Sequence, residues 1–323
     1  MKFVVVSHTD LDGWTCSYLL NDFIKHEYSD CEIENFQFTH GMDESEIFNA
    51  CINADEIYVA DVTLGDEIMA MFAPKINHFD HHASIINSKR PWWSNIKNEF
   101  SKVTVEGYLG TNDNQAEQTA ACELVWISLY GDKPMPKMVR LSGRYDVWDH
   151  DEQGKTYNLG NYVYNQINEK IFEFENPWFI DLFDDEKLEI ALQQGIAIGK
   201  FTYNADANSA KEMSVIKKIF GHKVFIANSN KSSSTYFNYL RFLHPDVEGC
   251  IIFKYYFDKQ LWRFSCYSFS DNFIALDFLK EFTKYVTPIT IGGHLKACGM
   301  ALSTDDILKF LHVINEGETY VGS

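Results

Sequence analysis

Three short apolar runs in the first hundred residues end directly in acidic and histidine residues. FVVVS (3–7) leads into His8, Asp10 and Asp12, IYVA (57–60) leads into Asp61, and INHF (76–79) leads into Asp80, His81 and His82. Runs of this length, rich in β-branched and aromatic residues, predict buried strands of a parallel sheet. Ligands of open α/β sheets bind beyond the carboxyl ends of the strands. The sequence therefore predicts a binuclear metal site at one edge of such a sheet.

The first half of the chain alternates predicted strands and helices, which is typical of a doubly wound α/β fold. Further strands are expected over 75–80 and 103–108, and a helix is expected from Gln115 to Gly131. The segment 136–150 begins as a helix and carries a second acidic cluster, with Asp146 and Asp149 beside His150. These patterns predict an N-terminal parallel-sheet domain.

The second half differs in pattern. Residues 186–220 are rich in Ala, Lys and Gln and predict a helical linker, whereas 223–230, 249–257 and 261–269 predict strands. We therefore expect a two-domain α/β protein. Its parts are an N-terminal domain over 1–185, the linker over 186–220 and a smaller C-terminal α/β domain over 221–323.

Composition limits the ligands and the location. The net charge of −18, from 28 Lys and Arg against 46 Asp and Glu, would repel a long polyanion, so a phosphate ligand should be small or held by metals. Seven scattered cysteines without a C-x-x-C pair predict free thiols in a reducing compartment. No apolar stretch approaches the roughly 20 residues of a membrane span, and the N-terminus is unlike a signal peptide. We expect a cytoplasmic protein with no membrane partner.

One turn after the first strand can aim several metal ligands. From His8 to Gly13, alternate residues leaving the strand point the same way, and the glycine frees the backbone to start a helix. Asp61, from a neighbouring strand end, is the natural bridging carboxylate, and His81 and Asp146 complete the coordination of a second ion. Mixed imidazole and carboxylate sets suit Mn²⁺, Fe²⁺ or Co²⁺ better than Mg²⁺.

Five motifs in order carry a resemblance to a known family. They are HTDLDG (8–13), ADVT (60–63), FDHH (79–82), YDVWDH (145–150) and GGHLKACG (292–299). In this order and spacing the chain resembles the DHH/DHHA1 phosphoesterase superfamily over nearly its whole length. The opening SHTDLDG is most similar to the nanoRNase branch, which degrades very short RNA. The resemblance implies a DHH catalytic domain followed by a DHHA1 substrate-binding domain.

The resemblance also implies roles for individual residues. One metal ion is held by His8, Asp10 and Asp61, and the other by Asp12, Asp61, His81 and Asp146. Asp80 matches the Asp of the DHH triplet and orients a histidine from behind the ligands, whereas His82 faces the substrate. Gly292, Gly293 and His294 match a glycine-rich loop that closes over the substrate, where backbone amides can approach a phosphate.

Two features depart from the family pattern. Only Gly292 and Gly293 precede His294, where family members have a longer glycine run. Tyr267 occupies the place of the arginine in a strand of the form S-x-R-S. Arg263, on the same face of that strand, can substitute for the arginine, or Tyr267 can stack on a base. Both departures bear on the substrate and not on the metal chemistry.

Three further features have two interpretations each. His78 lies within a predicted strand and is interpreted as structural rather than as an outer ligand. Trp93, near the DHH triplet, is the favoured base-stacking residue, although most aromatic residues of such a chain belong to the core. The polar run 228–234 either binds a terminal phosphate or forms a surface turn.

We therefore expect a two-metal 3′–5′ exonuclease that hydrolyses short oligoribonucleotides to nucleoside 5′-monophosphates, with Asp61, His82 and His294 in catalysis. A cyclic dinucleotide phosphodiesterase, a 3′-phosphoadenosine 5′-phosphate phosphatase and an inactive nucleotide-binding regulator are the competing hypotheses. The expected cofactors are two divalent ions, Mn²⁺ first, with Co²⁺, Fe²⁺ or Mg²⁺ as options. The expected partners are short RNA or a small nucleotide, without long duplex nucleic acid, and a second copy in a homodimer.

Overall fold

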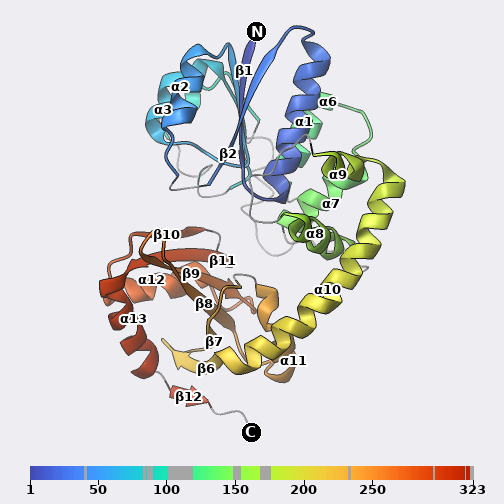
Figure 1. Ribbon diagram of the computed structural model, residues 1–323. Helices are drawn as coiled ribbons and strands as arrows, with labels where there is room; N and C mark the ends of the chain where they lie inside the picture. Colours follow the sequence, from blue (N-terminus) through green and yellow to red (C-terminus); the bar gives the residue numbers. More distant parts are fainter. Residues whose placement is uncertain are drawn as a thin grey trace. The chain divides into compact units, whose positions relative to one another are not determined.

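The computed structural model divides the chain into two compact units, 1–199 and 200–323, shown in Figure 1. It describes residues 1–39, 42–82, 85, 90–100, 119–147, 154–167, 176–231, 234–293, 295–316 and 318–320. The predicted strand at 103–108, the cluster residues Asp149 and His150, and the loop residue His294 lie outside the described residues.

The strands and helices of the first unit alternate as predicted. The strands are β1 (Lys2–His8), β2 (Glu32–Phe38), β3 (Glu56–Ala60), β4 (Ile76–Phe79) and β5 (Asn98–Glu99). The helices are α1 (Leu11–Glu27), α2 (Ser45–Asn53), α3 (Asp66–Phe72), α6 (Ala121–Tyr130), α7 (Lys137–Asp146), α8 (Lys155–Gln166) and α9 (Pro177–Ile180). The helix α10 (Asp185–Met213) runs from the first unit into the second.

The five strands of the first unit form one parallel sheet in the order β2-β1-β3-β4-β5, so the predicted doubly wound fold is confirmed. The chain moves from β1 to β2 on one side and then returns to β3 on the other side. The gap between the carboxyl ends of β1 and β3 is therefore a topological switch point, where open α/β sheets bind ligands.

Alternating residues of β1 build the two cores of this unit. Val4 and Val6 pack with α2 and α3 on one face, whereas Phe3 and Val5 pack with α1 and α6 on the other (Figure 1). All four side chains are fully buried, and burial of each contributes roughly 1.5–3 kcal/mol. Packing on both faces fixes the strand ends that carry the polar clusters.

The second unit is built on a seven-stranded sheet in the order β10-β11-β9-β8-β7-β6-β12. Its strands are β6 (Ser214–Ile219), β7 (His222–Asn228), β8 (Gly249–Tyr256), β9 (Leu261–Ser268), β10 (Thr290–Gly293), β11 (Ala297–Ser303) and β12 (Glu318–Tyr320). Its helices are α11 (Asn238–Leu243), α12 (Ala275–Glu281) and α13 (Thr304–Glu316). The β7–β8 pair is parallel, whereas the other strand pairs are antiparallel.

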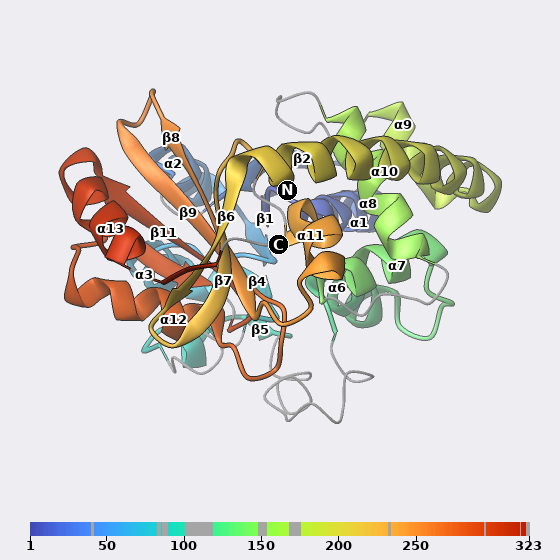
Figure 2. The ribbon, with the colours of Figure 1, turned by 90° about the horizontal axis from the view of Figure 1, so that it is seen from below.

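Different helices cover the two faces of this sheet: α12 and α13 lie on one face and α11 on the other (Figure 2). One face packs against α12 and α13 through an aromatic core that includes Phe264, Phe282 and Phe310. On the other face, Phe225 of β7 stacks on Phe237 beside α11, with ring centroids 4.9 Å apart. This second core covers strands β6, β7 and β8 on that face. Arg263 of β9 points to the same face but is exposed.

The predicted helical linker is shorter than expected. The α10 helix ends at Met213, and β6 begins at Ser214, inside the range 186–220 that the composition indicated as helical. The sequence S-V-I-K-K-I has no strict alternation, so pairing with β7 on one side and β12 on the other defines this strand. A hairpin with β7 and a long-range pairing with β12 thus form a strand where the composition indicated a helix.

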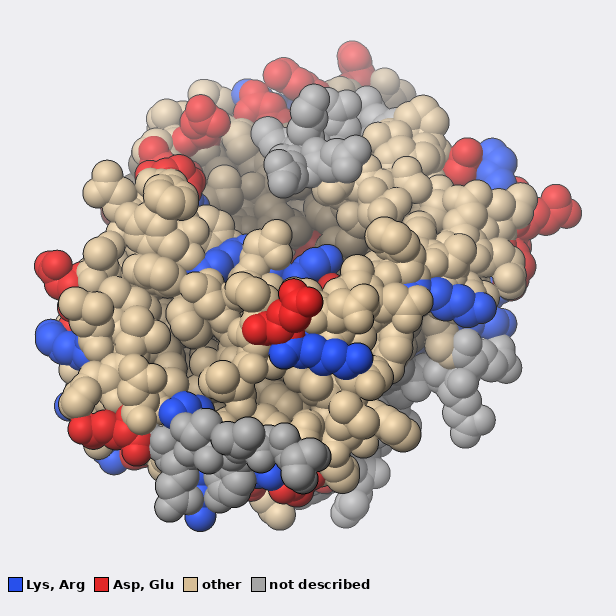
Figure 3. Space-filling model, turned by 60° about the horizontal axis from the view of Figure 1, so that its bottom comes forward, with Lys and Arg blue, Asp and Glu red and all other residues tan. Residues whose placement is uncertain are grey.

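The cysteines agree with the prediction of free thiols. All seven cysteines are free, and six of them are buried. On the face shown in Figure 3, Lys and Arg side chains are scattered among uncharged residues and interspersed with Asp and Glu. Within the described ranges, every helix is too short or too polar to cross a membrane.

Candidate metal centre

Asp61 lies at the centre of the polar cluster, directly after β3. Its Oδ1 is 3.2 Å from His81 Nε2, and its Oδ2 is 3.8 Å from His8 Nδ1. The side chain is buried, and Oδ2 has no hydrogen-bond partner among the described residues. The backbone is left-handed, with φ 60°, which costs roughly 1–2 kcal/mol for a residue with a Cβ. The two oxygens of one carboxylate therefore point to two separate groups of ligands.

The first group consists of His8, Asp10 and Asp61, whose ligand atoms lie within 4.8 Å of one another. His8 Nδ1 is 2.5 Å from Asp10 Oδ2. The other oxygen of Asp10 accepts a hydrogen bond of 3.0 Å from the Gly13 N–H and so caps α1. The start of α1 thereby fixes the orientation of Asp10.

Gly13 has a steric role that differs from the expected conformational one. A Cβ at this position would lie 2.3 Å from the carbonyl oxygen of His8. The first turn of α1 can therefore approach the end of β1 only because residue 13 has no side chain. This close approach brings Asp10 and Asp12 back over the strand end.

The second group consists of Asp12, His81 and Asp146. His81 Nε2 is 3.1 Å from Asp146 Oδ2 and 3.9 Å from Asp12 Oδ2. The Asp12 carboxylate accepts hydrogen bonds of 2.9 Å from the backbone N–H groups of Ala121 and Cys122, at the start of α6. The partial positive charge of a helix N-terminus stabilises such a carboxylate. Sequence reasoning missed these two amides, which are more than a hundred residues away along the chain.

The buried charges of the site do not balance among themselves. Burial and the nearby Asp146 raise the pKa of Asp12 to about 7, and burial and Asp10 raise the pKa of Asp61 well above its ordinary value. Burial alone would raise the pKa of Asp10, but the adjacent His8 outweighs it and the pKa is lowered. Several carboxyl groups thus lie close together in a buried space, and their negative charges repel one another. Two divalent cations would supply the missing positive charge, so the residues present fit a binuclear centre.

Comparison with known proteins identifies the fold. No protein-family model and no curated protein sequence matches this chain. Its structure is similar to a DHH-domain protein described as a member of a family of ribosomal proteins. The TM-score is 0.68 at 11% identity, and the match covers 98% of this chain and 86% of the other. The chain has the fold of the DHH-domain proteins.

Two enzymes have the same DHH fold. PggH from Vibrio cholerae, a pGpG-specific phosphodiesterase, matches with a TM-score of 0.52 at 15% identity over 98% of this chain and 100% of its own. RecJ from Thermus thermophilus, solved with Mn²⁺, matches with a TM-score of 0.57 at 11% identity over 97% of this chain. The match spans only 51% of the RecJ chain. Identities this low show the common fold and not a common substrate.

The three residues of the DHH triplet, Asp80, His81 and His82, make different contacts. His81 lies between Asp61 and Asp146, as described above, whereas Asp80 is fully buried behind the ligands. Asp80 Oδ1 accepts hydrogen bonds of 2.8 Å from both the backbone N–H and the Nδ1 of His82. His82 can also join Asp61 and His81 in a third group of ligand atoms. The geometry thus lets His82 face either an ion or a substrate.

Arg263 and Tyr267 lie on one face of β9, as the alternation predicted, but in different surroundings. Arg263 is exposed, lies opposite Lys254 of β8, and its guanidinium carbon is 5.2 Å from the centre of the Tyr256 ring. Tyr267 is partly buried against the core beside α11, and burial raises its pKa to about 12. On the neighbouring strand β11, the small residue Gly299 lies opposite Ser265 of β9. Arg263 is therefore better placed than Tyr267 to meet an anion.

The two glycines of the expected loop belong to β10 and are exposed. Gly293 has φ 125°, and a Cβ there would lie 2.7 Å from Cys298 Cα, so the backbone requires glycine. A Cβ on Gly292 would meet nothing within 4 Å. Only the second glycine is needed for the local backbone, and the following His294 lies outside the described residues.

The prediction that Trp93 stacks on a base is wrong. Its side chain is only 9% exposed and stacks on Trp92, with ring centroids 5.4 Å apart. Both rings pack in the core formed by α2, α3 and the strands of the parallel sheet. The sequence pattern could not separate a core tryptophan from a ligand-binding one, because both occur next to strand ends.

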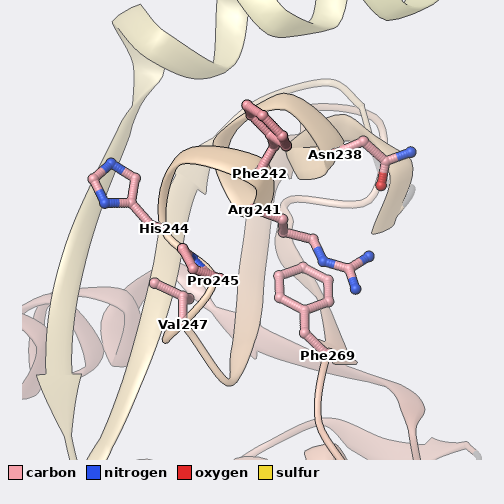
Figure 4. A pocket seen from close by; sticks show the side chains of 7 residues that line it. All are labelled: Asn238, Arg241, Phe242, His244, Pro245, Val247 and Phe269. Atoms are coloured by element: carbon pink, nitrogen blue, oxygen red, sulfur yellow. The ribbon is translucent and has the colours of Figure 1, made fainter.

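Two open hollows are lined by described residues of the second unit. The polar run after β7 lines one of about 610 Å³, formed by Asn208, Ser209, Glu212, Met213, Asn228, Ser229, Asn230, Lys254 and Tyr255. The other, of about 290 Å³, lies beside α11 (Figure 4). There the Arg241 guanidinium lies 4.2 Å from the centre of the Phe269 ring. Neither hollow contains a cluster of metal-ligand side chains among the described residues.

Proposed function

We propose that this protein is a metal-dependent phosphodiesterase that hydrolyses short linear oligoribonucleotides to nucleoside 5′-monophosphates. The carrying observation is the buried Asp61 carboxylate, whose two oxygens face two groups of His and Asp ligands. Bound divalent cations would acidify water and neutralise phosphate charge at this site. The mixed imidazole and carboxylate donors favour Mn²⁺ over Mg²⁺.

The residues around this centre suit phosphodiester hydrolysis. Asp61 holds the two ligand groups together, and its φ of 60° directs the carboxylate into the site. His82 keeps its Nδ1 on Asp80, so its Nε2 is the atom available to a phosphate oxygen or a leaving group. For the second unit we propose substrate binding by the exposed Arg263 and, from its motif alone, by His294.

Two observations favour a short substrate. PggH, which is specific for pGpG, a linear dinucleotide, matches this chain over the full length of both proteins. The acidic composition also disfavours a long polyanion, because each additional phosphate adds repulsion. We propose attack from the 3′ end, releasing one nucleoside monophosphate at a time.

Product analysis with Mn²⁺ tests this proposal. The purified chain would be incubated with labelled RNA dinucleotides, a pentamer, a longer single strand, a cyclic dinucleotide and 3′-phosphoadenosine 5′-phosphate. We expect mononucleotides from the dinucleotides at the highest rate and falling rates with length. Equal or better rates on the long strand would exclude the short-substrate proposal. Phosphate release from the bisphosphorylated nucleotide without dinucleotide cleavage would favour the phosphatase hypothesis.

The same panel separates the remaining candidate functions. A cyclic dinucleotide phosphodiesterase would open the cyclic substrate faster than it cleaves the linear dinucleotide. An inactive nucleotide-binding regulator would bind substrates without any product. Asp61→Asn is the matched control, since it keeps the size and the backbone preference of the residue but removes the bridging charge.

A further inference from the structure

A buried line of hydrogen bonds leads from Glu99 to His82 behind the metal ligands. Glu99 Oε2 is 3.3 Å from His78 Nδ1, and His78 Nε2 is 3.1 Å from Thr63 Oγ1. Thr63 donates a bond of 2.8 Å to Asp80 Oδ2, and Asp80 Oδ1 is 2.8 Å from His82 Nδ1. The ends of β3, β4 and β5 supply the first four residues. Neither metal coordination nor substrate binding explains Glu99, His78 or Thr63.

The donors and acceptors along this line fix the proton positions. The Asp80 carboxylate can only accept, so Thr63 gives its single hydroxyl hydrogen to Asp80. Toward His78, the Thr63 oxygen must then accept, and the Glu99 carboxylate also accepts. His78 therefore donates from both ring nitrogens and has the doubly protonated form. At the other end, Asp80 selects the tautomer of His82 that carries hydrogen on Nδ1.

Burial makes this arrangement specific. His78 and Asp80 are both fully buried, and His78 Nε2 is 3.7 Å from Asp80 Oδ2. The rings of Trp92 and Trp93 stand perpendicular to the His78 ring, with centroids 6.3 and 5.6 Å away. A buried cation between two carboxylates has its charge compensated, whereas breaking such a set leaves an uncompensated buried charge. Purely structural burial of His78 would not require this continuous connection to the site.

We propose that Glu99, His78 and Thr63 are positioning residues for His82. They hold the Asp80 carboxylate in one orientation, so that His82 keeps Nδ1–H on Asp80 and directs Nε2 to the reacting phosphate. Outer partners of this kind typically change activity or metal affinity about 10–100-fold when they are removed. The catalytic consequence rests on the proposed phosphodiesterase function, whereas the proton positions do not.

The proton positions can be tested without any activity measurement. Nitrogen-15 histidine spectra of the full chain, metal-free or with diamagnetic Mg²⁺ at neutral pH, would show the protonation of each ring. His78→Gln and His82→Ala would identify the two resonances. We expect His78 to be doubly protonated and His82 to carry its proton on Nδ1. A neutral His78, or a His82 protonated on Nε2 alone, would overturn the proposal whatever the substrate proves to be.

Kinetics of paired variants test the positioning role. Thr63→Val removes the hydroxyl at constant shape, and Thr63→Ser restores it, while Thr283→Val makes the same change on the exposed surface of the other unit. With an RNA dinucleotide and Mn²⁺, we expect Thr63→Val to lower kcat about 10–100-fold, with KM and Mn²⁺ affinity within about twofold. Thr63→Ser should recover most of the loss, and Thr283→Val should have no effect.

A double variant distinguishes positioning from general damage. If Thr63 acts through His82, Thr63→Val should cost little more once His82→Ala is present, because the two changes remove the same contribution. Fully additive losses, or a loss of Mn²⁺ binding that accounts for the lower rate, would refute the positioning role. If Thr63→Val does not fold, Glu99→Gln and Glu99→Leu provide the equivalent pair. If the wild-type chain cleaves no nucleotide, the function fails and the spectra still decide the proton positions.

Discussion

The two units of this chain have opposite electrostatic characters. Residues 1–199 contain 14 Lys and Arg against 34 Asp and Glu, whereas residues 200–323 contain 14 against 12. The net negative charge of the chain therefore lies entirely in the unit with the parallel sheet and the candidate metal ligands. The near-neutral unit presents Arg263 and Lys254 on the antiparallel strand pair β8–β9. This difference in charge agrees with the proposed function, in which the first unit binds metal cations and the second unit binds an anionic substrate.

The units also differ in how their sites are built. In the first unit the ligands follow strand ends that the parallel sheet brings to one edge, and helix N-termini hold them from behind. In the second unit Arg263 and Tyr267 lie on one face of the inner strand β9, where alternation sets only which side of the sheet they occupy. A single change should therefore have larger effects in the first unit than in the second.

The largest expected effect is that of Asp61→Asn. Loss of the bridging charge should lower kcat by a factor on the order of 10³, comparable to the loss of a key electrostatic contact in other enzymes. Calorimetric titration should show weak or absent Mn²⁺ binding. Asp30→Ala, an exposed aspartate of the same unit, is the control and should bind Mn²⁺ normally. Full activity in Asp61→Asn would remove the bridging role.

A pair of glycine-to-alanine substitutions, one in each unit, tests whether the first unit tolerates an added Cβ less well than the second. Gly13→Ala would place a Cβ 2.3 Å from the His8 carbonyl oxygen, so we expect a loss of about 3 kcal/mol in the free energy of unfolding. Gly292→Ala points into open space and should change stability by less than about 0.5 kcal/mol. Chemical denaturation measures both. Equal effects of the two substitutions would contradict the steric argument.

The pH dependence of the metal-free protein is the next test. The pKa values of Asp12 and Asp61 are raised in the folded state, so these groups bind more protons folded than unfolded, and the stability that this confers is lost as the pH rises above about 4. The raised pKa of His81, which burial alone would lower but Asp146 and Asp61 raise, adds stability below its unfolded value that is lost at higher pH.

Denaturation with a chelator present should therefore show lower stability at pH about 8 than at pH about 5.5. Added Mn²⁺ should reverse the order, because binding requires deprotonated ligands and favours high pH. Hydrogen exchange can localise the effect, which we expect in residues 1–199 and not in the sheet of the other unit. A metal-free protein that becomes more stable toward pH 8 would contradict the charge imbalance.

The smallest expected effect belongs to the second unit. Arg263→Ala should raise KM for an RNA dinucleotide about tenfold with little change in kcat, since one charge-assisted contact is worth roughly 1.5–3 kcal/mol before solvent screening. Lys280→Ala, an exposed residue of α12, is the control for charge alone. A larger effect on kcat than on KM would indicate that Arg263 contacts the reacting phosphate. It would also contradict the expectation that single changes have smaller effects in the second unit than in the first.

Sequence reasoning recovered the parallel sheet, and the structure brings the candidate ligands together at one edge of it. His8, Asp10, Asp12, Asp61 and His81 could be singled out because short continuous apolar runs mark buried strands and these polar residues follow directly after them. Asp146 needed the motif order, since a helix delivers it from far away. Trp93 was misassigned because burial depends on which helices cover it. The strand β6 was missed because its composition resembles that of the preceding helix, although its hairpin partner β7 follows it directly.

The sequence by itself determined the class of the fold and the chemistry of the ligand set, since strand period and residue type are local properties. Tertiary structure alone decided that Asp61 faces two groups, that the N-terminus of α6 holds Asp12, and that Glu99 and His78 reach His82 through Thr63 and Asp80. Those features depend on distances between segments that lie far apart in the chain. No local pattern encodes such distances, because they arise only when the strands and helices pack.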